Sequence, residues 1–216
     1  MAVDTILFGD CRKTLGTLKA QITTGIAERP RMCVTSPPYY GLRDYGGEDK
    51  QIGQEQTPEE YIQNLVEVFR SVRDVLTDDG TLWVNIGDSY YNYRPGKGQA
   101  LPKQTVSKTK QDLPDKCAKR GNKLEGLKEK DLIGIPWMLA FALRADGWYL
   151  RQDIIWHKPN PMPESVRDRC TKSHEYIFLL SKSKHYHYDN EAIKEPVKQD
   201  WGTRNRDNGK YHKEGT

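Results

Sequence analysis

The residues with the clearest chemical meaning form one short run, Thr35-Ser36-Pro37-Pro38-Tyr39-Tyr40. Two consecutive prolines fix the backbone and remove two N–H donors, so the carbonyls of Ser36 and Pro37 should be rigid acceptors. The Ser36 hydroxyl can accept as well, and the tyrosines offer flat faces beside these acceptors. The run therefore suits a planar ring that carries an amino group. Taken alone, it is also typical of a structural turn.

An amino group on an aromatic ring is a poor nucleophile, because its lone pair is delocalised into the ring. Acceptors that point at its hydrogens favour a more tetrahedral nitrogen and stabilise the positive charge that develops when this nitrogen attacks. Such an attack needs alignment more than an enzyme nucleophile. Cys33 lies before the motif and no Pro-Cys pair occurs, so a thiol that attacks ring carbon is disfavoured. We expect Cys33 to be a small buried hydrophobic residue.

The elements that must hold this run follow an alternating α/β pattern. Thr57 is a good N-cap, Pro58 suits the first helical position and Glu60 completes a capping box, which together mark the clearest helix. A strand follows this helix closely, as is typical of an α/β layer. In full, the sequence predicts helices at 11–20, 58–76 and about 132–145, and strands at 4–9, 31–35, 81–86, 148–157 and 175–181.

Composition limits the class of protein. The 216 residues suit one domain or one and a half, and 36% hydrophobic residues suffice for one core. No apolar run is long enough to span a membrane, no basic leader is present, and the four distant cysteines suggest neither a zinc ribbon nor a disulfide scaffold. We therefore expect a cytoplasmic protein with no bound metal.

Charge is concentrated in one segment. Residues 94–130 hold 11 Lys and Arg against 4 Asp and Glu, whereas the whole chain has a net charge of only +4. Such a segment fits contact with a nucleic-acid backbone. A solvated loop explains the same charges equally well.

Five blocks extend the motif along the chain in a fixed order. They are FGDC (8–11), TSPPYYGLRDYG (35–46), LWVNIGDSY (82–90), RADGWYLRQDIIWHKPNPMP (144–163) and KSHEYIFLLSKSKHYHYD (172–189). On these blocks the chain resembles the DNA amino-methyltransferases, in the group whose target-base motif precedes the cofactor motif. The resemblance implies a Rossmann-like α/β sheet with flanking helices, S-adenosylmethionine as cofactor, and double-stranded DNA as partner. It also implies methyl transfer to an exocyclic base amine, as in restriction-modification.

The resemblance assigns roles to matching residues. It implies that Ser36, Pro37, Pro38 and Tyr39 grip a base that has been flipped out of the duplex. On the cofactor side it implies Gly9, Asp10, Cys11 and Ser36, with Asp10 near the adenine of the cofactor. A turn or N-cap carboxylate is the alternative for Asp10.

A second set of residues is implied around the base or along the DNA. It comprises Tyr40, Trp156, Lys158, Arg167 and Lys172, for which a strand end and surface charge are the alternatives. Arg169 and His174 lie in the same region, and Asn85 and Asp88 either shape the site or serve an ordinary turn.

The identity of the base depends on one residue. Serine at the first motif position resembles the cytosine-N4 enzymes, whereas the adenine enzymes more often carry aspartate, which is a stronger acceptor. Ser36 therefore favours cytosine N4, with adenine N6 as the alternative.

The chain departs from the family in one respect. Members of this group carry a glycine-rich F-x-G-x-G turn near the C-terminus, and here the only G-x-G is Gly96-Lys97-Gly98, which follows no apolar strand. We therefore expect an incomplete sheet that binds the cofactor weakly without a complementing C-terminal half. The expected layout is a catalytic domain at 1–93 and 131–190, a basic insertion at 94–130, and a polar tail at 191–216 that begins a target-recognition region. Two other hypotheses are a truncated, non-catalytic DNA-binding remnant, and an amino-methyltransferase of RNA or of protein glutamine.

Overall fold

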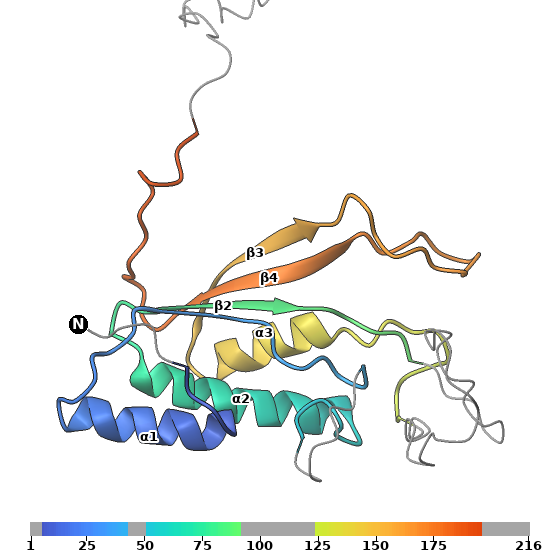
Figure 1. Cartoon of the computed structure of the whole chain (residues 1–216). Coiled ribbons are helices and arrows are strands. Elements are labelled where there is room, and N and C mark those ends of the chain that lie inside the picture. Colours follow the sequence, from blue (N-terminus) through green and yellow to red (C-terminus); the bar gives the residue numbers. More distant parts are fainter. Residues whose placement is uncertain (1–5, 43–50, 92–123, 196–216) are drawn as a thin grey trace, which may run out of the picture.

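The structure is a computed structural model that describes residues 6–42, 51–91 and 124–195. Helices and strands alternate within these ranges, as Figure 1 shows. Their order is α1 (Cys11–Thr23), β1 (Met32–Thr35), α2 (Pro58–Val75), β2 (Thr81–Ile86), α3 (Ile135–Ala145), β3 (Tyr149–His157) and β4 (His174–Ser181). The α/β class predicted from the sequence is confirmed.

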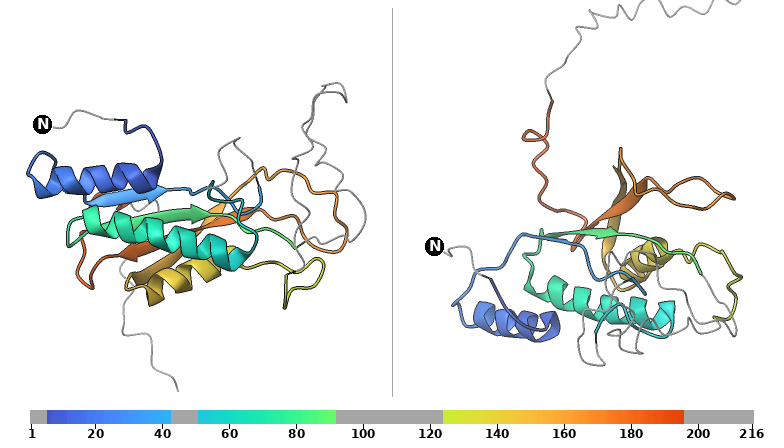
Figure 2. Two further views of the ribbon diagram at one scale, coloured as in Figure 1. Left: turned by 90° about the horizontal axis from the view of Figure 1, so that it is seen from below. Right: turned by 45° about the vertical axis from the view of Figure 1, so that its right-hand side comes forward.

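The four strands form one mixed sheet in the order β1-β2-β4-β3. β1 is parallel to β2, whereas β4 is antiparallel to both β2 and β3. In the two views of Figure 2, as in Figure 1, the helices α1, α2 and α3 lie on the same side of this sheet. The described helices therefore leave the opposite face of the sheet uncovered.

The core lies between the sheet and α2 and α3. Side chains of the strands alternate between the two faces, and those that point toward the helices are almost fully buried. Each such side chain contributes roughly 1.5–3 kcal/mol. The central ones are Tyr61, Leu65 and Phe69 of α2, Leu82, Val84 and Ile86 of β2, Leu139 and Leu143 of α3, and Phe178 and Leu180 of β4.

The start of α2 follows the predicted capping pattern closely. The Thr57 hydroxyl accepts a hydrogen bond from the Glu60 backbone N–H at 3.2 Å. The Glu60 carboxylate accepts from the N–H of Gln56 at 3.2 Å, one residue before the usual capping-box position. This cap holds the loop that precedes α2 close to the motif at residues 36–40.

Two boundaries differ from the prediction. The strand expected at 4–9 is wrong for its described part, because residues 6–9 form no strand and Ile6, Leu7 and Phe8 are largely exposed. A strand needs a neighbour for its backbone groups, and this segment pairs with none within the described ranges. α3 begins at Ile135, three residues later than expected, because Gly134 before it has a left-handed φ of 87°.

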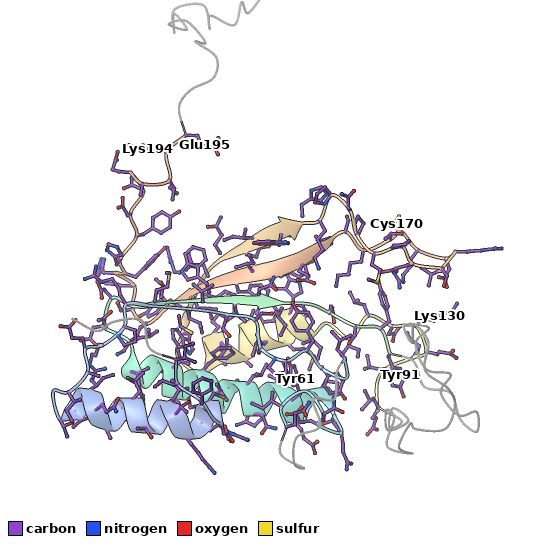
Figure 3. All side chains as sticks on the ribbon, in the orientation of Figure 1. Tyr61, Tyr91, Lys130, Cys170, Lys194 and Glu195 are labelled. Carbon is purple, nitrogen blue, oxygen red and sulfur yellow. The ribbon has the colours of Figure 1, made fainter. Side chains whose placement is uncertain are left out.

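The basic insertion lies mostly outside the described residues. Its described end, 124–130, contacts the segment that follows β2. The N–H of Lys130 donates to the Tyr91 carbonyl at 2.9 Å, and the N–H of Leu124 donates to the Tyr91 phenol at 3.0 Å. Figure 3 shows Tyr91 and Lys130 close together there.

None of the described helices is both long and apolar enough to cross a membrane.

Candidate active site

The proline motif lies where the parallel strands β1 and β2 end. Thr35 is the last residue of β1, and Ser36 after it is exposed, whereas Pro37 is buried. The Pro38 carbonyl accepts a hydrogen bond from the buried Tyr61 hydroxyl at 2.8 Å. Within the described ranges no hydrogen bond ends on the carbonyls of Ser36 or Pro37. The Pro38 carbonyl therefore anchors the turn. Among the described contacts, the carbonyls of Ser36 and Pro37, which the sequence predicts as acceptors, can still accept hydrogen bonds from a ligand.

Tyr39 is fixed through its phenol and through the edge of its ring. The phenol oxygen lies 2.9 Å from Asn85 Oδ1 and 3.1 Å from Glu175 Oε2, and the Ser36 hydroxyl approaches it at 3.4 Å. A Cβ atom added at Gly87 would lie 2.7 Å from Tyr39 Cε2. The ring therefore lies so close to the backbone at Gly87 that any larger residue there would clash with it. Burial raises the pKa of the phenol, which therefore stays protonated.

Tyr40 anchors the same turn to α2. Its ring centroid lies 5.4 Å from that of Tyr61, and its hydroxyl donates to the Gln56 carbonyl at 3.3 Å. Burial, with the charges of nearby glutamates, raises the pKa of Tyr40 to about 12. The structure thus gives Tyr40 an anchoring contact, and its role in the base pocket stays a prediction.

β3 and β4 bring a second group of side chains to Tyr39. Glu175 of β4 is half-buried, and it accepts hydrogen bonds from Tyr39 and from the ammonium of Lys158, which follows β3. Trp156 lies directly opposite Glu175 in the register and is 57% exposed. Directly opposed residues of antiparallel strands share a face, so Trp156 and Glu175 lie on the face that the helices leave uncovered.

Charge in this group is partly compensated. Partial burial acts to raise the pKa of Glu175, but the hydrogen bonds and charge of Lys158 and the bond from Tyr39 outweigh it, so this pKa lies below its usual value. Half-buried Lys172 has a pKa lowered by burial, although the charges of Asp88 and Glu175 oppose this. Lys158 pairs with Glu175 and so lies near Tyr39, and Lys172 lies close enough to Asp88 and Glu175 for their charges to act on it. Contact of either lysine with the base or the DNA stays a prediction. Glu175 was missed because its sequence position suggests only the start of a strand.

Asp88 caps the start of α3. Its carboxylate accepts hydrogen bonds from the backbone N–H groups of Gly134 at 3.0 Å, Ile135 at 3.1 Å and Ser89 at 2.9 Å. Because the N-cap residue Gly134 has no side chain, Asp88 takes over the capping of α3. Asp88 therefore has a structural contact, as the ordinary-turn alternative implied, although it caps a helix, and a part in shaping the site stays a prediction.

The Gly9-Asp10-Cys11 turn begins α1. Asp10 is the N-cap: its carboxylate accepts from the Arg12 N–H at 2.9 Å and pairs with the Arg12 guanidinium at 2.7 Å. These hydrogen bonds lower the pKa of Asp10 to about 2. Gly9 has a φ of 124°, which favours glycine, and Cys11 is exposed. A cofactor role for these three residues stays a prediction.

Arg167 lies in a different part of the surface. It lines an open cavity of about 810 Å³ together with Tyr90, Lys130 and Arg169. Arg169 stacks on the Tyr90 ring at 3.8 Å and pairs with Glu164. Arg167 is exposed beside this cavity and so remains a candidate for DNA contact.

Within the described ranges, no cluster of side chains could hold a metal ion.

Known proteins resemble this chain over most of its length. Residues 31–215 match the family described as DNA methylase. The Type II methyltransferase M.SmaI of Serratia marcescens is 53% identical over 197 residues, which cover 89% of this chain and 60% of that protein.

Two solved structures share the fold. One is the PvuII DNA methyltransferase (cytosine-N4-specific), at 16% identity and a TM-score of 0.51 over 84% of this chain and 50% of that one. The other is a putative DNA modification methylase of Thermus thermophilus in complex with S-adenosyl-L-methionine. It has 19% identity and a TM-score of 0.50, and the match covers 85% of this chain and 55% of that one. The fold is therefore the α/β fold of these methyltransferases, in part.

The chain spans only 60% of its Serratia relative and about half of each solved structure. The match over residues 31–215 nevertheless includes β1, the proline motif and every later helix and strand that the structure describes. This chain belongs to the DNA methylase family of N6 and N4 amino-methyltransferases.

Proposed function

We propose that this chain forms the base-binding part of a DNA methyltransferase that moves a methyl group from S-adenosylmethionine to the exocyclic amine of a flipped base. The observation that carries the proposal is the rigid turn after β1. It presents the exposed Ser36 hydroxyl and two acceptor carbonyls beside a fixed tyrosine. The name of the Serratia relative, a Type II methyltransferase, supports a role in restriction-modification.

The motif acts by alignment. The base leaves the stack at a cost of a few kcal/mol, part of which is recovered when the base packs on Tyr39. The amine has two hydrogens, and they are accepted by two of three groups: the Ser36 hydroxyl and the carbonyls of Ser36 and Pro37. As the nitrogen forms its bond to the methyl carbon, the bond from that carbon to sulfur breaks and its electron pair stays on sulfur. The acceptors stabilise the positive charge on nitrogen until one of its protons leaves to water. When bound, S-adenosylmethionine supplies the methyl group on a positively charged sulfur atom.

The described residues can account for only some of the contacts that S-adenosylmethionine needs. Ser36 is exposed at the end of β1, where a donor or acceptor could meet a ligand. The Asp10 carboxylate is already bound by the backbone and guanidinium of Arg12, so it has little capacity left for ligand hydroxyls. No glycine-rich turn follows a strand in the described ranges. We propose that the remaining contacts come from a further segment.

We place that segment along the free edge of β1. In the described structure β1 pairs on one side only, with β2. Its side chains Met32 and Val34 are 57% and 69% exposed, although both are apolar. An apolar edge strand pairs readily with another strand. The occupant that we propose is the part of the relatives that this chain does not match.

A mixing experiment tests this edge. The chain is combined with the unmatched part of the Serratia relative, and labelled methyl transfer to DNA is measured. Val34→Lys should reduce the transfer at least tenfold, because it puts a charge on the exposed apolar face of the strand that the segment would join. The control Ile26→Lys, at an exposed residue after α1, should not. Equal transfer by both variants would contradict the placement.

We propose cytosine N4 as the target. A serine hydroxyl is a neutral acceptor, and Ser36 stands at the first motif position. The test is methyl transfer from labelled S-adenosylmethionine to DNA, with the complementing segment present. Ser36→Ala and Tyr39→Ala should each lose most of the transfer. Unchanged labelling of DNA by both variants counts against the site.

A further inference from the structure

Glu175 is a half-buried acid that the transfer step described above does not use. Its side chain is only 21% exposed, and it lies on β4, 136 positions after Tyr39 in the sequence. One carboxylate oxygen faces the Tyr39 phenol at 3.1 Å, and the other accepts from Lys158. A carboxylate is costly to bury unless both of its oxygens are satisfied. This arrangement satisfies both, and it does so on the ring that the proposed function requires.

The Tyr39 phenol has one hydrogen and two acceptors within reach. Asn85 Oδ1 lies at 2.9 Å and Glu175 Oε2 at 3.1 Å. Hydrogen bonds to an ionised acceptor are roughly twice as strong as those to a neutral one. Glu175 therefore competes well for the hydrogen despite the slightly longer distance. The Ser36 hydroxyl, at 3.4 Å, can in turn donate to the phenol oxygen.

Lys158 keeps this acceptor charged. Its ammonium pairs with Glu175, and its backbone N–H donates to the Ser173 carbonyl at 2.7 Å, which holds the start of its side chain beside β4. Lys158 therefore has a contact inside the protein that competes with any contact to DNA. The ion pair of Lys158 and Glu175 therefore fixes the position of the Tyr39 phenol, and the backbone at Gly87 lies against the edge of the ring.

We propose that Glu175 is a positioning residue: with Lys158 as its counter-ion, it fixes the orientation of the Tyr39 ring on which the target base packs. This inference rests on the proposed function and adds to it a residue outside the proline motif. Glu175 does not touch the substrate in this account, and it acts only through Tyr39.

The first test observes Tyr39 itself and needs no DNA. The chain is labelled with 3-fluorotyrosine, and the Tyr39 signal among its 12 tyrosines is identified by its loss in Tyr39→Phe. Glu175→Gln should shift the fluorine resonance of Tyr39 and lower the pKa of its phenol. Glu164→Gln is the matched control, because Glu164 is also a half-buried acid paired with a basic residue, Arg169. It should leave the Tyr39 signal unchanged.

The second test measures the consequence for transfer. With the complementing segment, Glu175→Gln should lower kcat at least tenfold while the KM for S-adenosylmethionine stays within threefold. In the Tyr39→Phe background the same change should have little further effect, since the phenol through which Glu175 acts is gone. Circular dichroism verifies that each variant is folded.

The outcomes separate this inference from the proposed function. A Tyr39 signal that does not respond to Glu175→Gln overturns the positioning role, whatever the transfer rate. A changed signal with an unchanged kcat overturns its importance for the reaction, and so do additive effects of the two substitutions. Absence of transfer by the complemented wild-type chain overturns the proposed function instead, and the fluorine spectrum still reports on the contact.

Discussion

Replacing Gly87 by alanine should displace Tyr39 and greatly reduce methyl transfer. The new Cβ would lie 2.7 Å from Tyr39 Cε2 and 3.2 Å from Cδ2. Carbon atoms of separate side chains rest at about 3.5–4.0 Å, so the ring must move by about 1 Å. The single phenol hydrogen has Asn85 and Glu175 as its acceptors within reach, and the ring therefore has little room to move without losing this hydrogen bond. Misplacement by about 1 Å can reduce an enzymatic rate by about 10²-fold.

The assay for this prediction is methyl transfer to DNA by the complemented chain, together with thermal unfolding. Crowding of this kind costs about 1–3 kcal/mol, so Gly87→Ala should also lower the melting temperature by several degrees. Gly16→Ala is the matched control, because a Cβ at Gly16 of α1 meets nothing within 4 Å. It should keep full activity and gain about 0.5–1 kcal/mol. Transfer by Gly87→Ala within about threefold of wild type would refute the reasoning.

Three further predictions concern the elements that carry the site. Asp88→Ala should destabilise the protein by about 1–3 kcal/mol in urea unfolding, because it leaves backbone N–H groups at the start of α3 without acceptors; Asp78→Ala, at a fully exposed acid, should leave the unfolding midpoint nearly unchanged. Asp10→Asn should destabilise at pH 7 and less so at pH 3. The folded pKa of about 2 lies below the usual 3.8, so the contribution of Asp10 is complete above that usual value and is lost as the pH falls toward 2. Since Asp10 is exposed, urea unfolding at pH 7 should show a loss of no more than about 1 kcal/mol, and an equal loss at both pH values would contradict the assignment. Leu180→Ala should cost about 2–5 kcal/mol, because Leu180 is fully buried between the sheet and the helices, and a loss below about 1 kcal/mol in the same assay would place it outside the core.

Much of the fold could be predicted because its signals are local. The cap at Thr57 and the apolar spacing after it mark α2 to within one residue at its end. β2 was predicted at its observed bounds, since a short apolar run between a turn and a polar stretch leaves little choice. The segment at 4–9 has the same apolar character, and it misled the prediction because a strand also requires a partner, which no local pattern reports.

The candidate site was predictable only in part. The proline motif is contiguous, so its rigidity and its acceptors could be inferred from the residues alone. The partners of Tyr39 could not, because Asn85 and Glu175 lie 46 and 136 residues away and meet it only through the sheet register. Lys158 shows the same limit: its position after a strand predicted a surface residue or a base contact, and the structure pairs it with Glu175.

The central claim is that the turn at Ser36–Tyr39 holds the exocyclic amine of a DNA base for methylation. Mass spectrometry of nucleosides tests it most directly, on DNA that the complemented chain has treated with labelled S-adenosylmethionine. The account predicts labelled N4-methylcytosine, and its loss when Ser36 is replaced by alanine. N6-methyladenine would keep the mechanism and overturn the choice of base. Label on ring carbon 5 of cytosine, or none in DNA at all, would contradict the central claim.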